Sequence, residues 1–119
     1  MPPHEHPYSP AYAVNGHGYV SGALSVDHNG QAVTGRREAL DAALERMRER
    51  LATIDMDFGD IVRLTYFVTD ISLRNEANAQ FVDNFPTPRP ARTFVEISRL
   101  PYNASVEIDS TAVKGPVLR

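Results

Sequence analysis

An arginine, Arg92, stands at the start of a strand-like run near the end of the chain, in the stretch RPARTFVEISRLPYNASVEID (residues 89–109). A guanidinium keeps its charge at ordinary pH, so a buried arginine needs a paired anion. Its planar fork suits a small carboxylate, which it can hold through two parallel hydrogen bonds. The other interpretation is a structural ion pair with Glu96, Glu107 or Asp109, and the residue types alone leave both open.

Two carboxylates, Glu107 and Asp109, follow in the last strand-like run, VEIDSTAV. Side chains alternate between the two faces of a strand, so these two acids share one face of the predicted strand. One acid can balance an arginine while the other orients a water molecule for attack on a substrate. The alternation does not say which acid has which role.

The glycines of NGHGYVSG do not form a nucleotide site. Gly16, Gly18 and Gly22 are spaced G-x-G-x-x-x-G, one residue away from the dinucleotide-binding pattern, and a strand follows them instead of a helix. Ser21 lacks the G-x-S-x-G frame of a nucleophilic serine, although its hydroxyl could still point toward a ligand. This segment therefore predicts no nucleotide cofactor.

The histidines and the absence of cysteine argue against a metal site. His4 and His6 lie in an N-terminal tail rich in proline and histidine, and His17 and His28 fall in turns without a carboxylate or second histidine at helical spacing. The chain has no cysteine, so thiolate ligands and a cysteine nucleophile are excluded. We predict no metal.

Length and charge predict one domain, residues 1–119, with residues 1–7 as a flexible tail. The 12 basic and 15 acidic side chains give a net charge of −3 and form no basic stripe, which argues against a nucleic-acid partner. No segment approaches the roughly 18 apolar residues that a membrane span needs, and no signal peptide is visible. We therefore expect a cytoplasmic protein without a membrane partner.

The first half of the chain predicts a hairpin and a helix. Residues 11–27 form two β-rich runs broken at Asn15-Gly16, a strong hairpin signal. Thr34 is the expected N-cap of a helix over residues 36–53. Its apolar positions recur at offsets of three and four: Leu40, Ala43, Leu44, Met47 and Leu51.

The second half predicts a strand over residues 59–70, a helix capped by Ser72, and strands over 92–100 and 105–113. The strand over 59–70 is apolar on both faces, with Val62, Leu64, Tyr66 and Val68 on one and Ile61 and Phe67 on the other. The inward residues of the helix are predicted to be Leu73, Ala77, Phe81, Val82 and Phe85.

The expected order is thus β-β-α-β-α-β-β, an α+β two-layer domain with both helices on one face of a mixed sheet. The other sheet face, around Tyr19, Arg63 and Phe67, is then left uncovered. Association of several copies is the simplest way to bury it.

Three stretches of the sequence resemble the YjgF/Rid/UK family of small trimeric proteins. They are PYSPAYAVNGHGYVSGALS near the start, NAQFVDNFP in the second helix, and RPARTFVEISRLPYNASVEIDSTAV near the end. The resemblance covers Tyr8 to about Val113. It implies a chorismate-mutase-like (bacillus type) fold, a homotrimer with clefts between subunits, and no cofactor.

The resemblance also implies a function, the hydrolysis of reactive 2-imino or enamino acids such as 2-iminopropanoate to a 2-keto acid and ammonia. By position, Arg92 corresponds to the arginine that binds the substrate carboxylate. Tyr8 and Ser21 correspond to residues of the cleft, and Asn78 to a helix asparagine near it. The main chain at Phe94 corresponds to groups that contact the substrate nitrogen.

The family resemblance places Asp109 where the archetype has a glutamate that positions the attacking water. Aspartate is one methylene shorter, and a displacement of about 1 Å at a reacting centre can cost about a hundredfold in rate. The alternative function is therefore a trimer that binds small 2-keto acids without turnover. RNA cleavage is attributed to some family members, but this sequence has neither a basic and aromatic stacking platform nor a paired histidine site, which argues against that activity here.

Overall fold

The computed structural model describes residues 6–115, so the expectation of a flexible tail falls largely on residues outside the described part. The first element is the expected hairpin, formed by β1 (Ala11–Val14) and β2 (His17–Leu24). Asn15 and Gly16 at its tip have φ angles of 50° and 77°. A two-residue turn between antiparallel strands needs this left-handed backbone, which asparagine and glycine adopt most easily.

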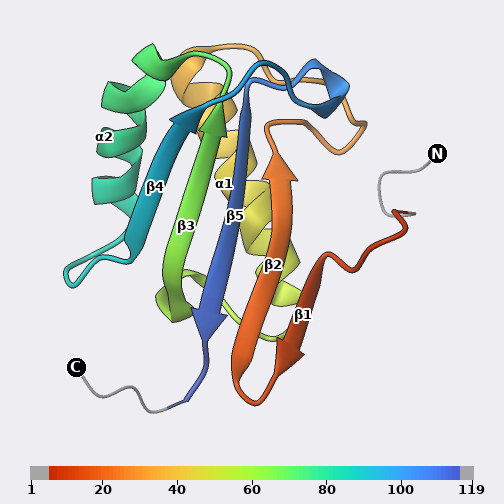
Figure 1. The fold of residues 1–119 in the computed structure, drawn as a ribbon, viewed down its shortest axis with the longest axis vertical. Helices are drawn as coiled ribbons and strands as arrows, with labels where there is room; N and C mark the ends of the chain where they lie inside the picture. Colours follow the sequence, from red (N-terminus) through yellow and green to blue (C-terminus); the bar gives the residue numbers. More distant parts are fainter. Residues whose placement is uncertain (1–5, 116–119) are drawn as a thin grey trace.

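Five strands form one mixed sheet in the order β1-β2-β5-β3-β4. The remaining strands are β3 (Ile61–Val68), β4 (Ala91–Glu96) and β5 (Val106–Val113). β4 lies parallel to β3 at one edge, and the other neighbours are antiparallel. Figure 1 shows α1 (Arg36–Ala52) and α2 (Arg74–Asn84) on the same side of this sheet, which confirms the predicted element order and the α+β two-layer class.

The face of α1 that meets the sheet is the predicted one. All five expected core positions are buried: Leu40, Ala43, Leu44, Met47 and Leu51. The predicted N-cap, Thr34, is wrong, because Gly35 occupies that position with φ 97° and its carbonyl accepts the first helical hydrogen bond, from Ala39. Only glycine adopts such a φ readily, so the glycine sets where the helix begins.

The start and the inward face of α2 differ from the prediction. Ser72 does not cap α2. Asp70 caps a short 3₁₀ turn, Ile71–Leu73, through a hydrogen bond from the Ser72 amide to its carboxylate at 2.9 Å, and α2 begins after it with Leu73 as an N-cap that makes no side-chain hydrogen bond. Val82 is 57% exposed, whereas Gln80 is fully buried. The helical period places residues 77, 80 and 81 on one side and residue 82 away from it, so the apolar side chain at 82 did not mark the core face.

Buried Gln80 joins both helices to the sheet. Its Oε1 accepts a hydrogen bond from the Tyr66 hydroxyl at 2.9 Å, and its Nε2 donates to Asp41 Oδ1 at 2.8 Å. Tyr66 lies in the centre of β3 and is also fully buried. This chain of hydrogen bonds fixes the ring of Tyr66 between α2 and the sheet.

An irregularity in β3 decides which side chains face the helices. The register between β3 and β5 shifts between Ile61 and Arg63, so Ile61 is buried while Val62 is 39% exposed, contrary to the prediction for Val62. Beyond the shift, Leu64, Tyr66 and Val68 face the helices as predicted. The opposite face, which we call the open face, carries Arg63, Thr65 and Phe67 on this strand.

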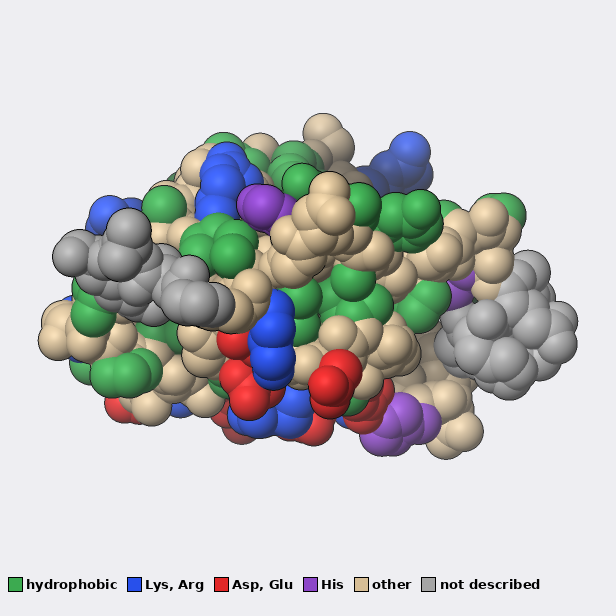
Figure 2. Space-filling model, turned by 90° about the horizontal axis from the view of Figure 1, so that it is seen from below, with side chains coloured by type: hydrophobic (Ala, Val, Ile, Leu, Met, Phe, Trp, Pro, Cys, Tyr) green, Lys and Arg blue, Asp and Glu red, His purple; other side chains and the backbone are tan. Residues whose placement is uncertain are grey.

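Charged side chains are mixed in sign on the surface. Figure 2 shows acidic and basic side chains next to one another at this end of the molecule, with hydrophobic side chains exposed beside them. Among the described residues, Arg37 pairs with Asp41 and Asp83. No helix among the described residues is long and apolar enough to cross a membrane.

The buried bridge through Gln80 provides a test of the packing. We expect Gln80→Leu to lower the free energy of unfolding by about 1–3 kcal/mol, because the buried Tyr66 hydroxyl loses its acceptor. The double variant Tyr66→Phe/Gln80→Leu removes both partners and should be less destabilised than the single variant. Urea unfolding measures these differences, with Val82→Ala as an exposed control on the same helix. A Gln80→Leu midpoint equal to that of the wild type would contradict the bridging role.

Candidate functional site

Arg92 sits near the start of the edge strand β4, opposite Leu64 of β3 in the parallel register. Leu64 faces the helices, so the Arg92 side chain enters the space between β4 and α2. There its Nη2 donates a hydrogen bond to Asn78 Oδ1 at 2.6 Å. The sheet and α2 thus bring together two residues that the sequence analysis placed in the site.

Three aromatic rings surround the guanidinium and form what we call the ring cage. Arg92 Cζ lies 5.3 Å from the ring centroid of Tyr66, 5.1 Å from that of Phe81 and 5.3 Å from that of Phe94. Ring faces attract a cation, and the attraction grows as water is excluded. The cage therefore holds the guanidinium in place without neutralising its charge.

The charge of Arg92 has no counterion in the described part of the chain. Its Nη1 is buried without a hydrogen-bond partner among residues 6–115. Of the proposed partners, Glu96 accepts a hydrogen bond from the Ile71 amide at 2.8 Å, and the other two acids lie on β5 with their side chains on the open face. The structure therefore does not support the structural ion pair.

The electrostatics of Arg92 follow from this position. Burial lowers the pKa of Arg92, and the nearby positive charge of Arg74 lowers it further. An arginine starts so far above neutrality that it stays charged. A half-buried cation with one donor atom unpaired is suited to receive an anion, such as a carboxylate, from outside.

β4 is the edge strand of the sheet and pairs with β3 on one side. The outer backbone groups of an edge strand have no strand partner, and they can bind a ligand instead. The expectation that the main chain at Phe94 meets the substrate nitrogen is compatible with this position. It stays a prediction.

The two acids lie together on the open face, as their alternation predicted. Val106, Ile108, Ser110 and Ala112 are buried toward the helices, and Glu107 and Asp109 alternate with them. Glu107 packs against Gly22 of β2, where an added methyl group would lie 2.5 Å from Glu107 Oε2. Burial raises the pKa of Glu107, neighbouring Asp109 raises it further, and Arg50 opposes both with a smaller effect.

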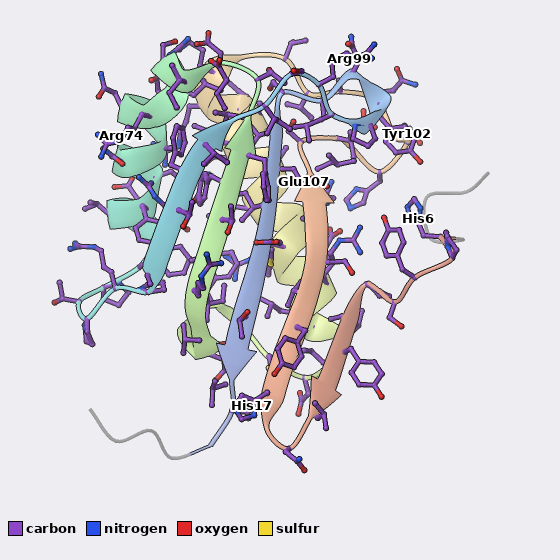
Figure 3. All side chains as sticks on the ribbon, in the orientation of Figure 1. His6, His17, Arg74, Arg99, Tyr102 and Glu107 are labelled. Atoms are coloured by element: carbon purple, nitrogen blue, oxygen red, sulfur yellow. The ribbon has the colours of Figure 1, made fainter. Side chains whose placement is uncertain are left out.

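Tyr8 and Ser21 lie on the β2 side of the sheet, away from Arg92. Ser21 joins the N-terminal segment to β2: its Oγ donates to the Ser9 carbonyl at 2.7 Å, and its amide donates to Pro10 at 3.0 Å. Tyr8 lines a cleft of about 390 Å³ beside β2, together with Leu24 and Arg50. Leu24 is the β2 register partner of Glu107. Figure 3 shows Glu107 on the central strand, far from the α2 edge.

The predicted site residues therefore form two groups on one chain. Arg92, Asn78 and Phe94 lie between β4 and α2, whereas Tyr8, Ser21 and the two acids lie at β2 and the open face of β5. The sequence analysis missed Tyr66 and Phe81 as members of the cage, although both were assigned inward positions. Within residues 6–115, no three His, Asp or Glu side chains gather closely enough to hold a metal ion.

Comparisons with known proteins agree with this fold. The sequence profile of the family described as "Endoribonuclease L-PSP" matches residues 1–114. Human 2-iminobutanoate/2-iminopropanoate deaminase is 34% identical over 113 residues, which cover 93% of this chain and 82% of that protein.

Solved structures match over nearly the whole chain. A Thermotoga maritima MSB8 protein superposes with a TM-score of 0.87 at 32% identity, covering 94% of this chain and 90% of that one. RidA from the Antarctic bacterium Psychrobacter sp. PAMC 21119 gives 0.85 at 28% identity, covering 92% and 90%. The α+β sheet with two helices is thus the chorismate-mutase-like fold that the resemblance implied, and the chain belongs to the YjgF/RidA/RutC family.

Proposed function

We propose that this protein hydrolyses reactive 2-imino or enamino acids to 2-keto acids and ammonia. The observation that carries the proposal is the guanidinium of Arg92, which is held by Asn78 and the ring cage while its buried Nη1 has no partner among the described residues. A substrate carboxylate supplies the missing anion. The 34% identity to the human imine deaminase supports the same reaction class.

The reaction needs only binding, orientation and one proton relay. Water attacks the imine carbon, its proton passes to a carboxylate, and the nitrogen is protonated to give a carbinolamine. The hydroxyl proton of this intermediate then passes to the nitrogen, the C–N bond breaks as the carbonyl forms, and ammonia leaves the 2-keto acid. Overall, R–C(=NH)–COO⁻ and H₂O give R–CO–COO⁻ and NH₃.

Of the two acids, Glu107 is the better candidate to accept the proton from water. It packs against Gly22, next to Ser21, and burial raises its pKa toward the range in which a carboxylate is an effective base. Asp109, which the family resemblance assigned to this role, is the neighbour that raises this pKa. We therefore propose that Glu107 accepts the proton from the attacking water and that Asp109 raises the pKa of Glu107.

One chain does not bring these groups to one substrate. Arg92 faces α2, whereas Glu107 lies on the opposite, open face of the sheet. We propose that copies assemble, as the resemblance to trimeric proteins implies, so that Arg92 and Asn78 of one copy meet Tyr8, Ser21 and Glu107 of the next. The exposed Tyr12 and Tyr19 are consistent with a sheet face that another copy covers.

A second function, binding of 2-keto acids without turnover, uses the same arginine. It is favoured by the fact that Arg92, Asn78 and the ring cage are complete without either acid. Both functions predict that a small carboxylate binds at Arg92. Turnover of an imine separates them.

The first prediction concerns Arg92. An amino-acid oxidase generates 2-iminopropanoate, and semicarbazide traps the imine that the protein has not yet hydrolysed. The wild type should suppress semicarbazone formation. Arg92→Ala should lower kcat/KM at least about a hundredfold, equivalent to about 2.7 kcal/mol, because the carboxylate loses its charge-assisted hydrogen bonds.

The matched control is Arg89→Ala, an exposed arginine just before β4, which should behave as wild type. If the wild type leaves semicarbazone formation unchanged but binds 2-oxobutyrate, the binding function replaces the deaminase. If Arg92→Ala retains full activity, Arg92 does not hold the substrate.

The second prediction separates the two acids by their pH dependence. A carboxylate must be ionised to accept a proton from water, so kcat/KM falls as pH drops through its pKa. Asp109 raises the pKa of Glu107, so Asp109→Asn should move this acidic limb to lower pH and leave the plateau largely intact. Glu107→Gln should lower kcat/KM about a hundredfold or more across the whole pH range.

Both profiles are measured on the same imine after subtraction of the uncatalysed hydrolysis. Thr111→Ser, on the same face of β5, controls for changes in packing. The opposite result would contradict this assignment: loss of activity at every pH in Asp109→Asn, and only a shifted acidic limb in Glu107→Gln. Asp109 would then be the acid that accepts the proton from water.

A further inference from the structure

A second guanidinium, that of Arg74, lies on the same helix as the asparagine that holds Arg92. Arg74 is the first residue of α2, and Asn78 follows four positions later. Residues four apart share one face of a helix, about 6 Å apart along its axis. Figure 3 shows Arg74 on α2, at the edge of the molecule. A cation is therefore positioned about one helical turn beyond the contact between Asn78 and Arg92.

Arg74 is exposed and does not belong to the ion pairs found among residues 6–115. The acids on and near α2 pair instead with arginines of α1: Arg36 pairs with Asp70 and Glu76, and Arg37 pairs with Asp83. The charge of Arg74 also reaches the site, because it lowers the pKa of Arg92. Two like charges are thus placed near each other, and an anion that meets both reduces their repulsion.

We propose that the site selects acids with two carboxylates, in which Arg92 binds the carboxylate next to the reacting carbon and Arg74 binds the distal one. The inference rests on the proposed carboxylate site at Arg92. It narrows the substrates to 2-imino dicarboxylic acids of four or five carbons, and the products to the corresponding 2-keto acids. The terminal carbons of an extended five-carbon acid lie about 5 Å apart, close to one helical turn.

The competing explanation is that Arg74 is a solvated charge that attracts every anion alike. Such a general effect acts on acids with one and two carboxylates and weakens with salt, because exposed charges are screened beyond about 8 Å at physiological ionic strength. A direct contact instead acts on the distal carboxylate alone. A matched pair of ligands separates these cases.

The test uses 2-oxoglutarate and 2-oxopentanoate, which have five carbons each and differ at the distal end, where one has a carboxylate and the other a methyl group. Dissociation constants are measured by titration calorimetry on the assembled protein at pH 7 and constant ionic strength. The wild type should bind 2-oxoglutarate about tenfold more tightly, as one charge-assisted contact allows. Arg74→Gln should abolish this preference and leave the affinity for 2-oxopentanoate unchanged.

Arg99→Gln is the matched control, since Arg99 is another exposed arginine outside the ion pairs of the described residues, and it should change neither affinity. Equal wild-type affinities for the two acids, or an equal loss for both in Arg74→Gln, would overturn the inference while leaving the site at Arg92 intact. Failure of both acids to bind the wild type would overturn the proposed carboxylate site as well.

Discussion

The structure depends on an uncompensated charge. Arg92 enters the space between β4 and α2, where Asn78 and three aromatic rings hold it, and its Nη1 has no partner among the described residues. Removing a charge from water costs several kcal/mol unless another charge compensates it. An amide and three rings offset part of this cost, and in the proposed function the substrate carboxylate offsets the rest. The parallel pairing of β3 with β4 places the side chain there, because it puts Arg92 level with inward-facing Leu64.

The pleat of the sheet imposes the second constraint. Side chains on β5 alternate, so burial of Val106 and Ile108 requires Glu107 and Asp109 to face away from the helices. A base on the open face and a carboxylate clamp on the helix face cannot act on one small molecule within one chain. Chemistry that uses both therefore requires association of copies, which would also cover the exposed tyrosines of the open face. In this account the alternation of side chains on β5 explains both why copies associate and why catalysis needs that association.

The sequence predicted the elements well because their signals are local. The Asn15-Gly16 turn, the apolar stripe of α1 and the alternation on β5 each report a periodicity or a backbone preference. The error at Thr34 arose because the positive φ of Gly35 sets the start of α1, and the error at Ser72 because Asp70 caps a 3₁₀ turn that precedes α2. Whether Arg92 pairs with an acid of the chain could not be predicted from the sequence. Alternation shows which side chains of one strand share a face, but it does not show how the faces of β4 and β5 are related. The ring cage combines residues of β3, α2 and β4, so only the tertiary structure reveals it.

Subunit mixing tests the central claim, a site shared between copies, most directly. Arg92→Ala and Glu107→Gln proteins are each prepared, unfolded together, refolded as a mixture and assayed for imine hydrolysis. If one copy supplies Arg92 and the next supplies Glu107, about a quarter of the clefts in a random mixture regain both groups, and activity returns from two inactive parents. If the mixture stays as inactive as its parents while mixed wild-type controls refold fully, the site does not draw Arg92 and Glu107 from different copies, and the account is wrong.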